Sequence, residues 1–94
     1  MSKQILEFNL PVSIFKEEDK FVAYAPVLDL STSADTFEKV KKRFSEIVYI
    51  FFEELKEKGT LNQVLEELGW QMVKQNWFPP VLVSQESEKI QVSI

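Results

Sequence analysis

The first part of the chain alternates between apolar and polar residues with the period of a half-buried β-strand. The apolar positions of one parity are Phe8, Leu10, Val12 and Ile14. Because proline has no backbone N–H to donate, we expect strand pairing to begin at or after Pro11, or the strand to be bulged or at a sheet edge there. Residues 16–20 are a polar break of hairpin length, and residues 21–25 are a second apolar strand that ends at Pro26.

A long amphipathic helix is predicted next. Its apolar stripe, which repeats at three and four residues, consists of Phe37, Val40, Phe44, Ile47, Val48, Phe51 and Leu55. Asp35 or Thr36 is expected to cap the first turn, and Glu38 stands at the capping-box distance from Asp35. Lys58 and Gly59 are typical of a helix end. We expect the stripe to cover one face of the sheet.

The remaining residues predict a short helix and several strand candidates. Residues 60–63 repeat the capping-box pattern, and Gly69 is expected to end the helix that follows. Residues 77–80 must be extended, because each proline disfavours helix in the residue before it. Three further segments have strand character: residues 70–74, 81–83 and 90–94. The alternation in the last of these predicts that it pairs with a sheet edge.

A series of motifs between Pro11 and Val40 has a recognisable order. It consists of LPVSIF at residues 10–15, an acidic turn at 16–20, FVAYAP at 21–26, LDLST at 28–32 and ADTFE at 34–38. This order resembles the HicB family, the antitoxin half of a bacterial toxin and antitoxin pair. In this resemblance, residues 10–15, 21–26 and 28–32 look like the first three strands of the family. The chain lacks the glycine that the family usually has in the turn, and Ala34 stands where the family usually has another.

The resemblance, taken with the pattern, implies an α+β fold and a single HicB-like domain over residues 1–94. We expect a three-stranded antiparallel meander, then a long helix, a short helix and one or more C-terminal strands, similar to a truncated ribonuclease H fold. The resemblance also implies binding to a small basic toxin that cleaves messenger RNA. Many members of the family add a DNA-binding region, but residues 59–94 are too short and too acidic to predict one here.

Composition narrows the function classes. Fifteen acidic against 11 basic residues give a net charge of −4, which opposes direct nucleic-acid binding and favours a basic partner, although it also serves solubility. The chain has no cysteine and no histidine, so it lacks thiol chemistry and the commonest general base and metal ligand. We therefore predict a protein that is not an enzyme and needs no cofactor. Without a signal-peptide pattern at residues 1–13 or a long apolar run, we expect a cytoplasmic protein without membrane contact.

Two groups of apolar residues are candidates for binding a partner. Tyr49 widens the helix stripe and is a candidate for contacting a partner. Ile50 lies away from the stripe, so it is expected either to contact a partner or a second copy, or to be covered by the second helix or the tail. Trp70, Trp77 and Phe78 form the second candidate surface, because tryptophan is enriched at interface hot spots. The alternative is that the two tryptophans attach the tail to the sheet.

The charged residues are weaker candidates for a functional site than these apolar groups. The ribonuclease H likeness would make Glu7, Asp29 and Glu46 candidates for the metal-binding carboxylates of a nuclease, but Glu46 is expected to face solvent. Residues 17–19 are interpreted as a solvated hairpin tip. The basic residues Lys39, Lys41, Lys42 and Arg43 are interpreted as a salt-bridged outer face, with Glu38 and Glu46 both pairing with Lys42.

From these observations we predict a non-catalytic protein-binding module that resembles a HicB antitoxin. An orphan member of the family, which keeps the fold but has lost its toxin, stays open as an alternative. The expected partners are a small basic toxin and further copies of the same chain. The alternative is a small oligomeric structural or ligand-binding domain with an aromatic-lined cleft between the sheet and the tail.

Overall fold

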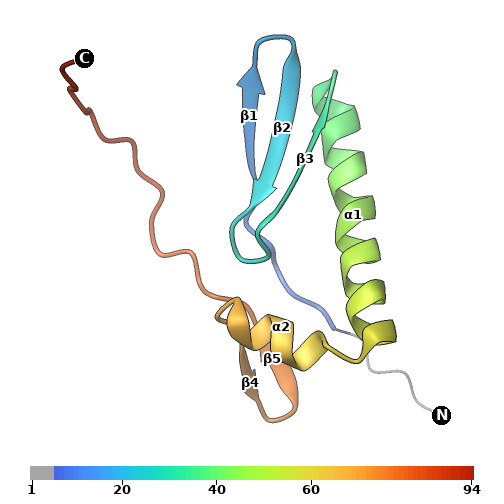
Figure 1. Cartoon of the computed structure of the whole chain (residues 1–94). Helices are drawn as coiled ribbons and strands as arrows, with labels where there is room; N and C mark the ends of the chain where they lie inside the picture. The colour runs from blue at the N-terminus through green and yellow to red at the C-terminus, as the bar shows by residue number, and fades with distance from the viewer. Residues whose placement is uncertain (1–5) are drawn as a thin grey trace.

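The computed structural model describes residues 6–94, so the first five residues, part of the segment weighed as a signal peptide, lie outside it. Its elements are β1 (Ser13–Glu17), β2 (Lys20–Ala25), β3 (Leu30–Ala34), α1 (Phe37–Lys58), α2 (Leu61–Glu67), β4 (Gln71–Val73) and β5 (Asn76–Phe78). The first three strands form one antiparallel sheet in the order β1-β2-β3, and β4 and β5 form a separate antiparallel pair (Figure 1). The α+β class and the order of elements predicted from the sequence are confirmed.

Strand boundaries differ from the prediction at β3. Pairing between β1 and β2 begins at Ser13, after Pro11 as expected. The third strand, however, begins at Leu30 and not at Leu28, because a turn over residues 26–29 precedes it. In this turn the Leu28 amide donates to the Ala25 carbonyl and the Asp29 amide to the Pro26 carbonyl, both at 3.2 Å. The strand prediction at residues 28–29 was therefore wrong.

Local capping determines both ends of α1. The Thr36 hydroxyl accepts from the Lys39 amide at 3.1 Å, which makes Thr36 the N-cap. Gly59 ends the helix with a φ of 68°, a left-handed conformation in which glycine avoids the steric cost of a side chain. The predicted capping box between Asp35 and Glu38 was wrong, since Asp35 is not the N-cap. Thr60 precedes α2 without a side-chain capping bond, so the second predicted box is also absent.

Small side chains let α1 lie close to the sheet. The residues buried between them, here called the alanine cluster, are Ala23, Ala25, Ala34, Val40 and Phe44. The last two come from the predicted stripe, so its central part does cover the sheet as expected. Phe37, the first residue of the stripe, stays exposed at the helix start, with its ring centroid 6.2 Å from that of Phe21.

A second core joins the C-terminal half to the sheet. The tryptophan cluster consists of Leu28, Leu65, Trp70 and Trp77, which are all buried. Phe8 packs edge-on against Trp70, with 4.9 Å between ring centroids, and lies 5.6 Å from Phe52 of α1. The indole nitrogen of Trp70 donates to the carbonyl of Val27 at 2.7 Å. The β2–β3 turn, α1, α2 and the β4–β5 hairpin are thereby held together.

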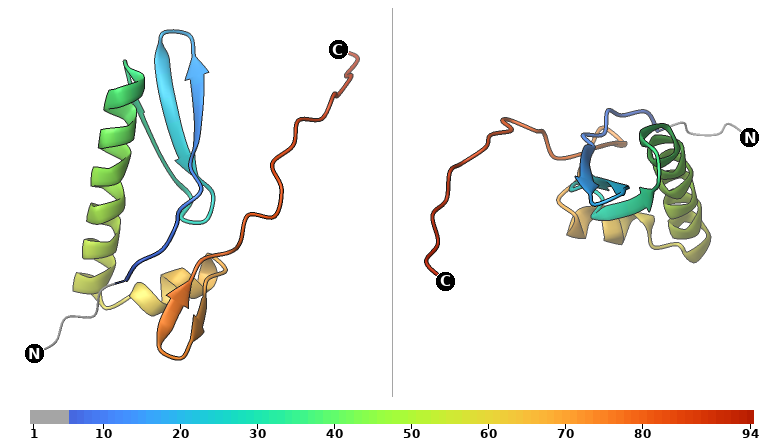
Figure 2. Two further views of the ribbon diagram at one scale, coloured as in Figure 1. Left: turned by 180° about the vertical axis from the view of Figure 1, so that it is seen from behind. Right: turned by 90° about the horizontal axis from the view of Figure 1, so that it is seen from above.

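The C-terminal tail, residues 79–94, contains no helix or strand and extends away from the body (Figures 1 and 2). The predicted strands at residues 81–83 and 90–94 are therefore absent from the isolated chain, and the predicted pairing of the last residues with a sheet edge was wrong. The tail touches the sheet through the Gln85 amide nitrogen, which lies 3.2 Å from the Ser13 hydroxyl.

The Trp70–Val27 hydrogen bond can be measured by comparing two tryptophan substitutions. Trp70→Phe removes the donor and part of the ring, and should lower the free energy of unfolding by about 2–3 kcal/mol, because a partly buried carbonyl loses its partner and a small cavity forms. Trp77→Phe is the matched control, since among residues 6–94 no hydrogen bond comes from its indole. Urea unfolding followed by circular dichroism should show the control to be the milder variant. Equal losses would show that the bond contributes nothing beyond ring volume.

Candidate functional site

The outer face of α1 carries exposed apolar residues within an acidic surrounding. Tyr49 and Ile50 expose 68% and 52% of their surface, so neither α2 nor the tail covers Ile50. At 100° per residue, Glu46 and Glu54 lie one turn before and one turn after Ile50, and Glu53 lies one turn after Tyr49. We call this region the Tyr49–Ile50 surface; its members are Glu46, Tyr49, Ile50, Glu53, Glu54 and Glu57.

The charge of α1 changes sign along its length. Its first turns carry Lys39, Lys41, Lys42 and Arg43, whereas from Glu46 to Lys58 it carries four glutamates and two lysines. Glu53 is partly neutralised by Lys56, whose ammonium nitrogen lies 3.3 Å from its carboxylate. The remaining glutamates of the Tyr49–Ile50 surface are exposed to solvent. Glu46 thus faces solvent as predicted.

The second candidate surface is divided between the core and the exterior. Trp70 and Trp77 retain only 3% and 7% of their exposed area, so both belong to the tryptophan cluster and not to an accessible surface. Phe78, on β5 between them and the tail, is about half exposed. The structure therefore does not bring the three side chains together on one accessible surface. The two tryptophans attach α2 and the β4–β5 hairpin to the β2–β3 turn, and they do not hold the tail on the sheet.

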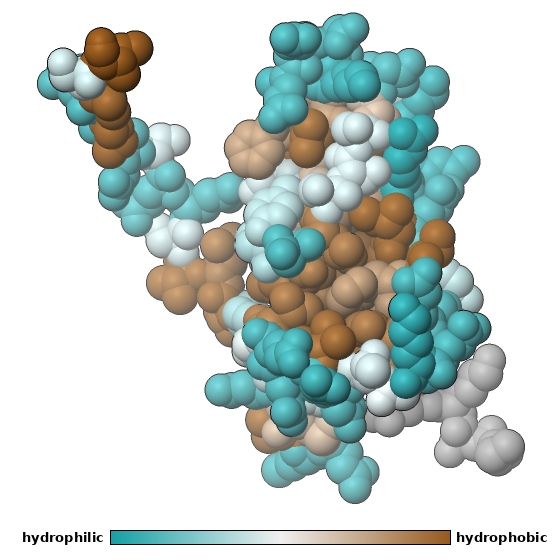
Figure 3. All heavy atoms as spheres, viewed as in Figure 1, coloured by the Kyte–Doolittle hydropathy of each residue, from teal (hydrophilic) through white to brown (hydrophobic). Residues whose placement is uncertain are grey.

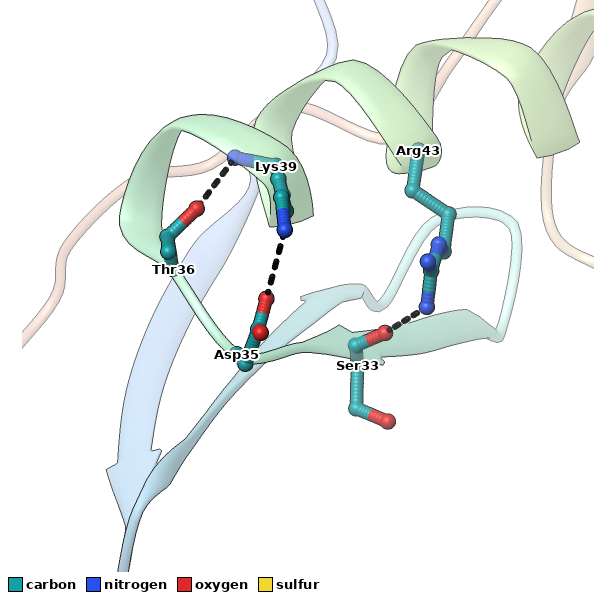
Figure 4. A network of polar contacts seen from close by, with 5 residues as sticks. All are labelled: Ser33, Asp35, Thr36, Lys39 and Arg43. Carbon is teal, nitrogen blue, oxygen red and sulfur yellow. Dashed lines mark hydrogen bonds and ion pairs between the residues drawn. The ribbon is translucent and has the colours of Figure 1, made fainter.

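The basic residues at the start of α1 engage the sheet and the capping region instead of the predicted glutamates (Figure 4). The Lys39 ammonium lies 3.3 Å from the Asp35 carboxylate, and the Arg43 guanidinium donates to the Ser33 carbonyl at 2.7 Å. The Lys41 ammonium lies 5.0 Å from the centroid of the Phe37 ring. Among residues 6–94 no ion pair joins Lys42 to Glu38 or Glu46, so that part of the prediction was wrong.

The carboxylates considered for a nuclease site lie on three separate segments of the fold. Glu7 precedes β1, Asp29 lies in the β2–β3 turn and Glu46 lies on the outer face of α1, and all three are exposed. Residues 17–20 line an open hollow together with Val22 and residues 31–33. In the described part of the chain, no three histidine, cysteine, aspartate or glutamate residues are grouped so as to hold a metal ion.

One polar contact was not anticipated from the sequence. The Tyr24 hydroxyl donates to the Asp29 carboxylate at 3.1 Å, joining the end of β2 to the turn that follows it. The five-residue spacing of Tyr24 and Asp29 around Pro26 is the sequence feature that indicates this contact, because a turn at the proline brings the two side chains back toward each other. The acidic residues around Ile50 could likewise have been identified from helical spacing alone.

None of the helices in residues 6–94 combines the length and the apolar character needed to cross a membrane.

The Tyr24–Asp29 contact predicts a pH dependence. The hydrogen bond to Asp29, with smaller contributions from desolvation and the nearby negative charge, raises the pKa of Tyr24 above its ordinary value of 10.0. Because the folded-state pKa is raised, the stabilisation is present at neutral pH and is lost as the pH rises through that pKa. Asp29→Asn should lower the pKa of Tyr24, as measured by tyrosinate absorbance in a Tyr49→Phe background. An unchanged titration would show that the carboxylate does not control this hydroxyl.

The chain was compared with protein-family models, with curated proteins and with solved structures, and none of them matches it.

Proposed function

We propose that this protein is a non-catalytic binding module of the HicB antitoxin type, and that it binds a small basic toxin through the Tyr49–Ile50 surface. The observation that carries this proposal is the pair of exposed apolar side chains among glutamates on α1. Apolar anchors surrounded by a charged rim are the arrangement of many protein interfaces. The order of motifs from Pro11 to Val40 supports the choice of family.

Charge complementarity determines which kind of partner this surface suits. Exposed glutamates attract a basic protein and raise its association rate, and they disfavour nucleic acid, which is itself a polyanion. The protein as a whole carries a net charge of −4, so the long-range field has the same sign as the local one. A basic ribonuclease has a positively charged RNA-binding face, and an acidic helix that covers this face would block access of messenger RNA.

The alternative of a small oligomeric module is favoured by a different observation, the exposed apolar residues of the tail. It concerns another part of the molecule and is compatible with toxin binding at α1.

A charge introduced at the centre of the Tyr49–Ile50 surface should weaken partner binding without unfolding the protein. Ile50→Glu places a like charge among Glu46, Glu54 and Glu57 and removes an apolar anchor, so affinity for the basic toxin should fall roughly tenfold or more, about 1.4 kcal/mol. The measurement is copurification from cells, followed by calorimetric titration with the small basic protein that copurifies. Asn62→Glu, on the exposed side of α2, adds the same charge elsewhere and should bind normally.

Circular dichroism and tryptophan emission identify a variant that has failed to fold. The proposal would be contradicted if Ile50→Glu remained folded and kept full affinity, or if the unmodified chain bound no such protein. If the purified chain cleaved RNA, and neutralising a single carboxylate removed this activity, the protein would instead be a nuclease.

A further inference from the structure

The end of the tail has the pattern of a strand but pairs with no strand within residues 6–94. Ile90, Val92 and Ile94 share one parity, and Gln91 and Ser93 share the other. All three apolar residues are largely exposed, with 70% of Ile90 and 73% of Val92 open to solvent. The far end of the tail forms an apolar group that stands apart from the body (Figure 3). Such a segment gains apolar burial and backbone hydrogen bonds only when it is added to a sheet.

Strand β1 offers an open edge for such an addition. Glu17 and Lys20 flank a two-residue hairpin turn and form its closing pair, so hydrogen-bonded pairs alternate from there along β1. By this alternation the backbone groups of Ile14 and Lys16 point away from β2. No strand in the described part of the chain lies on that side. β1 thus exposes an edge of five residues, the same length as residues 90–94.

The other edge of the sheet is less available. The outward carbonyl of Ser33 on β3 already accepts from Arg43 at 2.7 Å, and α1 packs along this strand. The apolar residues nearest the open edge are also at β1. Val12 and Phe15 are both exposed, and Ile14 is half-buried beside the alanine cluster. A strand placed against β1 would cover apolar surface that is exposed in the described part of the chain.

The path of the tail favours a second copy as the acceptor. Pro79 and Pro80 restrict the backbone where the tail begins, and a Cβ at Gly69 would lie 3.5 Å from the Pro80 ring, so this start packs against the body. The tail then passes the beginning of β1, where Gln85 contacts Ser13, and its last residues continue away from the sheet. Exchange of an identical segment between two copies needs only a pre-existing edge and a chain end that reaches outward.

We propose that residues 90–94 of one copy add as a strand to the open edge of β1 in a second copy, and that the reciprocal exchange forms a symmetric dimer. This proposal rests on the tail and β1 alone, and it is independent of toxin binding at the Tyr49–Ile50 surface.

The test is the molar mass of the full chain, measured by light scattering after size exclusion and by sedimentation over a range of concentrations. The unmodified protein should be a dimer at high concentration. Val92→Lys places a charge on the apolar parity of the tail and should give a monomer with unchanged circular dichroism. Ser93→Lys adds the same charge on the opposite parity. Its dimer dissociation constant should be at least tenfold lower than that of Val92→Lys.

A change on the acceptor side completes the test. Lys16→Pro removes a backbone donor that points away from β2, so the hairpin should tolerate it while strand addition is blocked. This variant should be monomeric with the tail intact, and the charge variants decide the question if it fails to fold. A monomeric unmodified chain at all concentrations, or a dimer that persists in Val92→Lys, would overturn the proposal. Loss of the dimer in Ile50→Glu would also overturn it, because that outcome places the contact on α1.

Discussion

The hydrogen bond from the Trp70 indole to the Val27 carbonyl is the contact on which the arrangement of the two halves depends. Val27 lies in the turn between β2 and β3, and Trp70 lies between α2 and the β4–β5 hairpin. The two residues are 43 positions apart in the chain, so the bond closes a long loop. A partly buried carbonyl without a donor would cost free energy, which makes this contact specific as well as stabilising. It determines where the C-terminal half meets the sheet.

The two cores are packed with side chains of different size. Three alanines in the alanine cluster allow α1 to approach the sheet closely, but their small side chains bury little apolar area. Large aromatic rings make up much of the tryptophan cluster and its surroundings, where they fill the wider space between α1, α2 and the N-terminal segment. Leu10, Leu30 and Val48 contact both clusters and make the core continuous. The stability of the sheet therefore also depends on the packing of the tryptophan cluster, which adjoins the alanine cluster.

The same helix that builds the core also displays the candidate binding surface. One side of α1 packs on both clusters, and the other presents Tyr49 and Ile50 among glutamates. The tail leaves the molecule on the β1 side of the sheet, whereas α1 lies on the β3 side (Figures 1 and 2). Partner binding at α1 and strand exchange at β1 would thus use separate surfaces. A dimer formed through the tails would leave both α1 surfaces free, and it could hold two toxin molecules at once.

Features that depend on neighbouring residues were determined by the sequence. The Thr36 cap, the end of α1 at Gly59, the β1–β2 hairpin and the exposure of Glu46 follow from local hydrogen bonding, backbone sterics and helical spacing.

Other features needed the tertiary structure. Trp70 and Trp77 have the composition of an interface hot spot, and only their contacts with Leu28 and Leu65 show that they are core residues. Arg43 binds the Ser33 carbonyl because β3 lies beside α1, a proximity that helical spacing does not reveal. The tail alternates like a strand, but a strand requires a partner edge, and the position of that edge is decided by the fold.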